Sequence, residues 1–190
     1  MLIAFSGHRK AGKTSLARFM QDICVSYGME EPEILSFASP LKELYCELNN
    51  LDIATLLLPD VKENHRKGLE DLSEQVKAED PTFFTDRLFA KINPAKHQII
   101  DDLRLFDIEF IPLFEKKVPI WRVYADYDKR RSRGALYDKA VDESKYERDL
   151  DWSAYTYYKL CGTGYIFNNK TPEDLKVEAH KLVSRYFFNL

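Results

Sequence analysis

The chain has 190 residues, of which 45% are hydrophobic and 31% are charged, and its formal net charge is −3. This composition is typical of one compact, water-soluble domain, and it excludes a general electrostatic attraction to nucleic acid or to an anionic membrane. The three cysteines lie far apart without C-x-x-C spacing, which argues against a zinc site and against a disulfide framework. A site for an anionic ligand must therefore be a local cluster of Lys and Arg.

The two ends of the sequence show no targeting signal. The apolar start Leu2–Phe5 is too short for a signal peptide, and Phe188-Asn189-Leu190 differs from the S-K-L peroxisomal signal. No apolar run approaches the roughly 20 residues that a membrane helix needs. We therefore expect the protein in the cytosol, with no membrane partner. We also expect a monomer with no nucleic-acid partner.

The first predicted strand and helix enclose a glycine-containing loop. Leu2–Ser6 is a short apolar run that ends at this loop, and it is predicted to be a buried strand. After Gly12 the apolar residues recur at helical spacing, and Gly28 is expected to end this helix. Its predicted apolar face comprises Leu16, Phe19, Met20, Ile23, Cys24 and Tyr27.

The middle of the chain is predicted to be mostly helical. A second strand is expected over residues 33–37. Ser39-Pro40 is typical of a helix cap followed by a first-turn proline. Residues 52–91 then have helical character, with breaks expected near Pro59 and at Asp80-Pro81.

Strands alternate with helices in the remainder of the chain. The expected elements are a strand over 98–100 that ends in Asp101-Asp102, a helix over 106–116, strands over 119–125 and 165–167, and a helix from Thr171. The last helix is predicted to bury Leu175, Ala179, Leu182, Val183 and Tyr186. This alternation predicts an α/β fold, a three-layer sandwich with a mostly parallel sheet, in a single domain.

Residues 7–14 match the phosphate-binding pattern G-x-x-x-x-G-K-[ST] in full. Glycines let backbone N–H groups approach phosphate oxygens, and the start of the following helix adds the positive end of its dipole. Lys13 can reach the β- and γ-phosphates, and the Thr14 hydroxyl can be a magnesium ligand. The residues expected to bind a nucleoside triphosphate are Gly7, His8, Arg9, Lys10, Ala11, Gly12, Lys13, Thr14 and Ser15.

The other motifs favour a kinase over a GTPase. The segment Asp101–Arg104 lacks the glycine of the GTPase pattern D-x-x-G. Asn169–Pro172 has a proline where a GTPase uses an aspartate to bind guanine. A small-molecule kinase instead needs cations that hold the acceptor and stabilise the transferred phosphoryl group.

Several arginines and lysines are placed as such a kinase requires. Arg130 and Arg133 follow a predicted strand, in the place for a mobile basic lid. Lys62 and Arg66 lie one helical turn apart, so they can share a helix face. Arg104 follows a strand end, where ligands bind in open α/β sheets.

Two aspartates follow the strand at 98–100. Asp101 or Asp102 could hold a magnesium-bound water or orient the acceptor, and Asp102 is the one we expect foremost in catalysis. Both are candidates for the metal site together with Thr14. A helix cap, or a structural partner for Arg104, is the alternative role. No protein nucleophile is needed, since direct in-line transfer relies on positioning and electrostatics.

These motifs resemble those of the animal-type phosphomevalonate kinases, a branch of the nucleoside-monophosphate-kinase-like P-loop fold. Their order and approximate spacing are similar over nearly the whole chain, and the basic loop and the D-P-x-F-F element are the most specific. The matching segments are Phe5–Lys13, Ser39–Glu43, Lys62-Glu63 with Arg66-Lys67, Glu79–Phe84, Asp102–Arg104, and Arg130 with Arg133-Gly134.

The resemblance implies a reaction in which ATP, with Mg²⁺, phosphorylates (R)-5-phosphomevalonate to 5-diphosphomevalonate. It implies that the loop holds ATP, that a helical region over about 39–95 helps to bind the acceptor, and that about 126–145 is the lid. The acceptor-binding residues would be Lys62, Arg66, Arg104 and Arg130. The residues engaged in phosphoryl transfer would be Lys13, Asp102, Arg104, Arg130 and Arg133.

Three positions depart from the family pattern. Thr14 stands where the animal enzymes typically carry an aspartate, Leu105 replaces a second arginine after Arg104, and Asp86 stands where a basic residue is expected. Because these departures fall mainly on the acceptor side, two alternatives stay open. One is a (deoxy)nucleoside monophosphate kinase, and the other is a non-catalytic nucleotide-binding protein.

Overall fold

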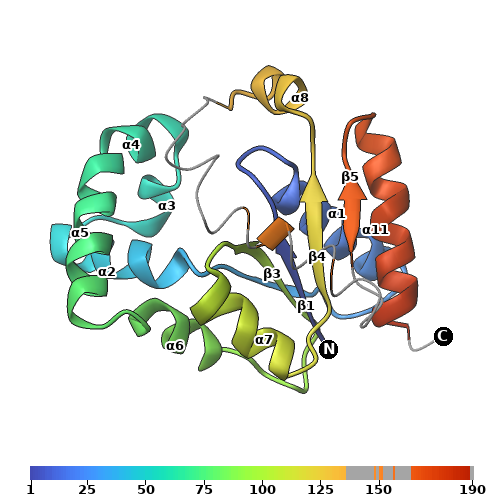
Figure 1. Ribbon diagram of the computed structural model, residues 1–190, viewed down its shortest axis with the longest axis horizontal. Helices are drawn as coiled ribbons and strands as arrows, with labels where there is room; N and C mark the ends of the chain where they lie inside the picture. The colour runs from blue at the N-terminus through green and yellow to red at the C-terminus, as the bar shows by residue number, and fades with distance from the viewer. Residues whose placement is uncertain (136–147, 149, 152–155, 157–163, 189–190) are drawn as a thin grey trace. The chain divides into compact units, whose positions relative to one another are not determined.

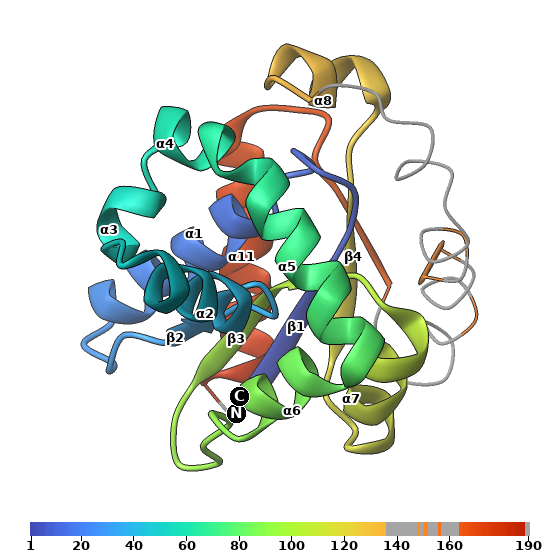
Figure 2. The ribbon, with the colours of Figure 1, turned by 90° about the vertical axis from the view of Figure 1, so that its left-hand side faces the viewer.

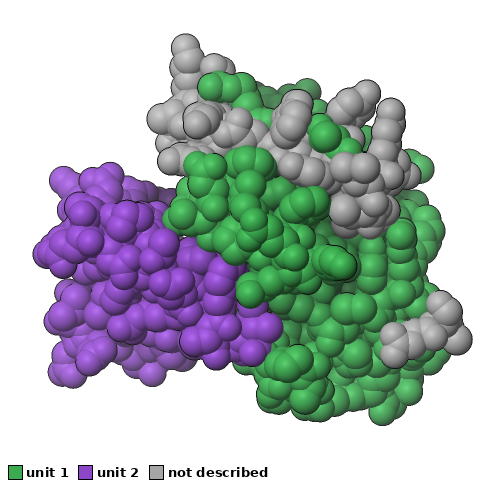
Figure 3. Space-filling view, turned by 60° about the horizontal axis from the view of Figure 1, so that its bottom comes forward, with its two compact units in different colours: residues 1–35, 93–190 green, residues 36–92 purple. Residues whose placement is uncertain are grey.

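The chain divides into two compact units. The computed structural model describes residues 1–135, 148, 150–151, 156 and 164–188. Unit 1 contains Met1–Leu35 and Asn93–Leu190, and unit 2 contains Ser36–Ile92 (Figure 3). Unit 2 is thus an insertion between two parts of unit 1, with bounds close to the helical region predicted over 39–95.

A parallel sheet forms the centre of unit 1. Its strand order is β2-β3-β1-β4-β5, and every neighbouring pair is parallel. The strands are β1 (Leu2–Ser6), β2 (Glu33–Leu35), β3 (Gln98–Leu103), β4 (Ile120–Tyr124) and β5 (Tyr165–Phe167). The predicted α/β class and parallel sheet are confirmed, although β2 is shorter than expected.

Helices cover both faces of this sheet. The long helices α1 (Lys13–Ser26) and α11 (Pro172–Tyr186) lie on one face, and α7 (Ile111–Glu115) lies on the other (Figure 1, Figure 2). The π-helical turn η1 (Phe106–Phe110) precedes α7, and α8 (Tyr127–Ser132) follows β4. The three predicted layers are therefore present. Within the part of the chain that the structure describes, no helix has the length and apolar character needed to cross a membrane.

Strand alternation decides which side chains reach which layer. Phe5, Ile99 and Val123 all join the core beneath α1 and α11. Since alternate residues of a strand point to the same face, Asp101 shares the face of Ile99 and points toward α1, in agreement with its hydrogen bond to Thr14. At Asp101-Asp102 the register of β3 against β1 shifts, because Ala4 lies opposite Ile100 whereas Ser6 lies opposite Leu103.

The predicted apolar faces of the two long helices are largely confirmed. The buried residues common to prediction and structure are Leu16, Met20, Ile23 and Cys24 in α1 and Leu175, Ala179, Leu182, Val183 and Tyr186 in α11. The inclusion of Tyr27 is wrong, because α1 ends at Ser26 and the Tyr27 side chain is 60% exposed. Gly28, with φ of 75°, follows directly.

Unit 2 is built from short helices. They are α2 (Ser39–Asn49), α3 (Ile53–Leu56), α4 (Pro59–Asn64), α5 (Arg66–Glu79) and α6 (Phe83–Phe89). The predicted breaks at Pro59 and Asp80-Pro81 are confirmed. Ser39 was expected to cap α2 but is its first residue, and Ala38 precedes it without a side-chain cap. A small core of Tyr45, Cys46, Leu56 and Leu69 joins α2, α3 and α5.

Thr171 caps α11, and its replacement tests how much this cap stabilises the fold. Its hydroxyl accepts a hydrogen bond from the Asp174 N–H at 3.2 Å, and the Asp174 carboxylate accepts one from the Thr171 N–H at 3.1 Å. We expect Thr171→Ala to lower the free energy of unfolding by about 1 kcal/mol in urea denaturation. Thr171→Ser is the matched control and should keep the wild-type value. An alanine variant as stable as the wild type would show that the cap contributes nothing.

Candidate functional site

The loop between β1 and α1 makes a tight turn with a glycine at each end. Gly7 and Gly12 have φ values of 143° and 106°, which other residues rarely adopt. A Cβ atom at Gly7 would overlap the Val123 carbonyl oxygen, and one at Gly12 would overlap the side-chain amide of Asn168. Both glycines are therefore required by close packing as well as by backbone conformation.

Lys13 begins α1 and folds back onto this loop. Its side chain is 8% exposed. Its Nζ atom donates hydrogen bonds to the carbonyl oxygens of Gly7 at 2.6 Å and His8 at 3.1 Å. Arg9 and Lys10 are exposed. The Lys13 ammonium group and the N-terminus of α1 therefore lie at the same loop, where an anion gains from both.

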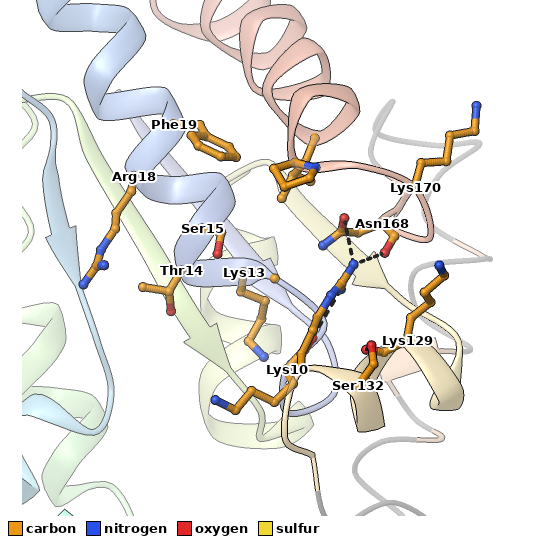
Figure 4. A pocket seen from close by; sticks show the side chains of 14 residues that line it. Lys10, Lys13, Thr14, Ser15, Arg18, Phe19, Lys129, Ser132, Asn168 and Lys170 are labelled. Atoms are coloured by element: carbon orange, nitrogen blue, oxygen red, sulfur yellow. Dashed lines mark hydrogen bonds between the residues drawn. The ribbon is translucent and has the colours of Figure 1, made fainter. Parts of the chain in front are cut away.

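A cavity of about 660 Å³ lies beside the loop and the start of α1, within unit 1 (Figure 4). Its lining residues include six cations and no acidic residue, and the cations are Lys10, Lys13, Arg18, Lys129, Arg133 and Lys170. Phe19, Pro172 and Leu175 add apolar surface to the lining. The concentration of positive charge suits a ligand with several negative charges, and the volume suits a nucleotide-sized molecule. The predicted nucleotide-binding residues that line it are Lys10, Gly12, Lys13, Thr14 and Ser15.

A hydroxyl and a carboxylate meet at the start of α1. Thr14 Oγ1 donates a hydrogen bond to Asp101 Oδ2 at 2.6 Å, and the Asp101 side chain is buried. Among the described residues no group of three or more His, Cys, Asp or Glu could hold a metal ion. Mg²⁺ does not require such a group, since it is commonly held by one or two protein oxygens, water and phosphate oxygens. The Thr14–Asp101 pair fits that donor set.

Glu109 holds the turn that follows β3. It is 5% exposed, and its Oε2 atom accepts hydrogen bonds from the backbone N–H groups of Arg104 at 2.6 Å and Leu105 at 2.9 Å. Burial raises the pKa of the Glu109 carboxyl from 4.5 to about 7, which outweighs the lowering by these two donors. The Arg104 side chain is exposed, so it is accessible to a ligand.

The two arginines predicted for a lid lie at the end of α8 and differ in their surroundings. Arg130 is 7% exposed, and its guanidinium lies 5.5 Å from the centre of the Tyr127 ring. Arg133 lines the cavity and donates a hydrogen bond to the carbonyl oxygen of Asn168 at 2.9 Å. The rest of the predicted lid, residues 136–145, lies outside the described residues.

The two other predicted acceptor-binding cations belong to unit 2. Lys62 lies in α4 and Arg66 begins α5, so the prediction that one helix carries both is wrong. The helices meet at His65, where ψ is 1° and the ring nitrogen Nδ1 lies 3.0 Å from the Tyr45 hydroxyl. Arg66 makes a bidentate ion pair with Glu63, at 2.7 and 2.6 Å.

Comparison with known proteins identifies the fold first. A shikimate kinase from Acinetobacter baumannii, solved in complex with shikimate, superposes with a TM-score of 0.50 at 13% identity, covering 99% of this chain and 93% of that chain. A dephospho-CoA kinase from Campylobacter jejuni gives a TM-score of 0.46 at 13% identity, covering 97% and 96%. The likeness to the shikimate kinase shows the fold, which is the P-loop fold of the nucleoside-monophosphate-kinase-like kinases.

The family follows from the sequence. The family model for phosphomevalonate kinase matches residues 5–118, which is more than half of the 190-residue chain. The chain therefore belongs to the phosphomevalonate kinase family, a family of phosphotransferases. Comparison with curated proteins found no significant match.

Sequence reasoning assigned no role to Asn168, Asn169 and Glu109. The two asparagines follow β5, and their position at the carboxyl end of a predicted parallel strand was a usable signal, since ligands bind at that edge of the sheet. Glu109 lies among the apolar residues of η1, where an acidic side chain predicts a specific partner. The partners of the two asparagines are distant in sequence, and those of Glu109 are backbone N–H groups. No spacing pattern in the sequence therefore reveals these specific contacts.

The Glu109 carboxyl predicts a pH-dependent stability. Because its folded pKa of about 7 lies above the usual 4.5, the folded state keeps a proton that the unfolded state has lost at intermediate pH. Its contribution to stability is therefore present at pH 4.5 and lost as pH rises through 7. We expect the difference in unfolding free energy between wild type and Glu109→Gln to fall by about 3 kcal/mol between pH 4.5 and pH 8. Urea denaturation across this range measures it, and a difference independent of pH would contradict the assigned pKa.

Proposed function

We propose that this protein is an ATP-dependent kinase that transfers the γ-phosphoryl group to an acceptor that already carries a phosphate, with phosphomevalonate as that acceptor. Membership of the phosphomevalonate kinase family supports the acceptor. The observation that carries the proposal is the conjunction at one basic cavity of the glycine-bounded loop, the Lys13 ammonium group and the Thr14–Asp101 pair.

The loop and the start of α1 would bind the triphosphate. Lys13 would exchange the carbonyl oxygens of Gly7 and His8 for the β- and γ-phosphate oxygens, which are stronger acceptors for an ammonium group. The backbone N–H groups of the loop and the helix dipole would contribute further positive potential. The apolar surface of Phe19, Pro172 and Leu175 would accommodate the base or ribose.

Magnesium would be held by the Thr14 hydroxyl and the Asp101 carboxylate, together with water and phosphate oxygens. When bound, the ion would neutralise charge on the phosphates. In the structure these two side chains are joined by a hydrogen bond of 2.6 Å, so they are already positioned as neighbouring oxygen ligands. This assignment makes Asp101 the aspartate nearest to magnesium and leaves Asp102 to orient the acceptor.

The transfer itself needs charge stabilisation and alignment. An oxygen of the acceptor's phosphate forms a bond to the γ-phosphorus, the bond to the β–γ bridging oxygen breaks, and ADP leaves. Arg104, Arg130 and Arg133 would stabilise the charge spread over the transferred group. Lys62 and Arg66 of unit 2 would bind the acceptor, and Arg66 would do so by exchanging its ion pair with Glu63 for a phosphate.

A (deoxy)nucleoside monophosphate kinase is the second candidate. Thr14 favours it, because the animal phosphomevalonate kinases typically carry an aspartate at this position. A nucleoside monophosphate would also need a surface on which its base can stack, whereas phosphomevalonate needs a small site rich in cations.

The monomeric state and the cytosolic location stay predictions.

A substrate panel tests the proposal. ADP release is measured with ATP, Mg²⁺ and either phosphomevalonate or each nucleoside monophosphate. We expect phosphomevalonate to stimulate turnover and Lys13→Ala to abolish tight ATP binding and lower turnover by about 100-fold or more. Lys176→Ala, which removes the same charge from an exposed position of α11, is the control and should leave both values unchanged.

Each outcome of the panel has a definite meaning. Stimulation only by a nucleoside monophosphate would mean that the acceptor is a nucleoside monophosphate instead of phosphomevalonate, whereas the reaction type would stay as proposed. ATP binding without stimulation by any acceptor would favour the non-catalytic alternative. A Lys13→Ala variant with unchanged ATP affinity would end the proposal as a whole.

A further inference from the structure

Asn168 is a buried polar residue at the carboxyl end of β5. Its side chain is 6% exposed, and Nδ2 donates a hydrogen bond of 2.8 Å to the carbonyl oxygen of Ala11, 157 residues away. A trans peptide points its carbonyl and its N–H in opposite directions, so this bond also fixes the direction of the Gly12 N–H. A backbone donor of the phosphate-binding loop, which follows the central strand, is therefore oriented by a side chain that follows the edge strand β5.

Arg133 contacts Asn168 from the other side. Its Nη2 atom donates to the Asn168 carbonyl oxygen at 2.9 Å and lies 3.4 Å from Oδ1, as the dashed lines at Asn168 show (Figure 4). Its Nη1 atom lies 3.5 Å from the carbonyl oxygen of Lys10. The residue that directly follows α8 is thereby joined both to the residue that follows β5 and to the loop.

Asn169 holds the opposite end of α8. Its Oδ1 atom accepts a hydrogen bond of 2.7 Å from the N–H of Asp126, the residue that precedes the helix. α8 spans only Tyr127–Ser132, so adjacent asparagines bind the residues at its two ends. Such a short helix gains little stability from its own hydrogen bonds and depends on anchors of this kind.

We propose that Asn168 and Asn169 are positioning residues that hold the phosphate-binding loop and α8 in one fixed relation, so that the nucleotide and Arg133 meet in the geometry needed for transfer. The inference rests on the proposed kinase function. It assigns different atoms to the two side chains, because Asn168 acts through its amide donor and Asn169 through its amide acceptor. An aspartate has no N–H donor but keeps acceptor oxygens.

Substitution by aspartate is therefore expected to weaken ATP binding at position 168 but not at position 169. Asn168→Asp removes the donor and places a carboxylate against the Ala11 carbonyl, so we expect the Kd for ATP to rise about tenfold or more in calorimetric titration. Asn169→Asp keeps its acceptor and is the matched control, with a Kd within about twofold of wild type. Melting temperatures are recorded for both, because a merely structural role would lower stability without weakening ATP binding by the folded protein.

A second pair of variants removes the amides without adding charge. Asn168→Ala should still raise the Kd for ATP several-fold, and it replaces the aspartate variant if that one fails to fold. Asn169→Ala should leave this Kd within about twofold but lower kcat about fivefold with the acceptor that gives turnover, since α8 loses one anchor.

Failure of this inference is distinguishable from failure of the proposed function. A wild-type protein that binds no ATP contradicts the kinase proposal itself. If the wild type binds ATP, Lys13→Ala does not, and both Asn168 variants bind like the wild type, the positioning role is refuted. It is equally refuted if Asn169→Asp weakens ATP binding as much as Asn168→Asp.

Discussion

The hydrogen bonds from the Lys13 ammonium group to the Gly7 and His8 carbonyl oxygens join the first strand of the sheet to its first helix. They are possible because Gly7 and Gly12 adopt backbone conformations that bring the loop against its neighbours. In this state the two carbonyl oxygens accept the hydrogen bonds that the Lys13 ammonium group would otherwise donate to phosphate oxygens. The cavity, the Thr14–Asp101 pair and the cations around them all depend on this junction for their position.

The parts that local sequence could predict are those set by neighbouring residues. The strand at Leu2–Ser6, the phosphate-binding loop and the face of α11 follow from apolar periodicity and glycine placement. The Thr171 cap was equally visible, because its partner lies three residues away. Tyr27 was misassigned because periodicity does not show where a helix ends. Local patterns are therefore a sound guide to the elements and a weaker one to their limits.

The parts that sequence could not predict are contacts between distant segments. The Asn168–Ala11 bond joins residues 157 apart, and the Thr14–Asp101 bond joins residues 87 apart. Of the two adjacent aspartates the sequence favoured Asp102 for catalysis, and only the hydrogen bond to Thr14 shows that Asp101 lies at the start of α1. The break at His65 likewise accompanies the contact with Tyr45, which no helical pattern records. Tertiary partners, rather than residue types, thus distinguish the roles within the candidate site.

The most direct test of the central claim is a crystal structure with a non-hydrolysable ATP analogue and Mg²⁺. The account predicts the triphosphate along the loop of residues 7–14, with Lys13 turned from its carbonyl partners toward the β- and γ-phosphates and the ion beside Thr14 and Asp101. A triphosphate bound elsewhere, or a Lys13 that keeps its bonds to Gly7 and His8 in the complex, would contradict it.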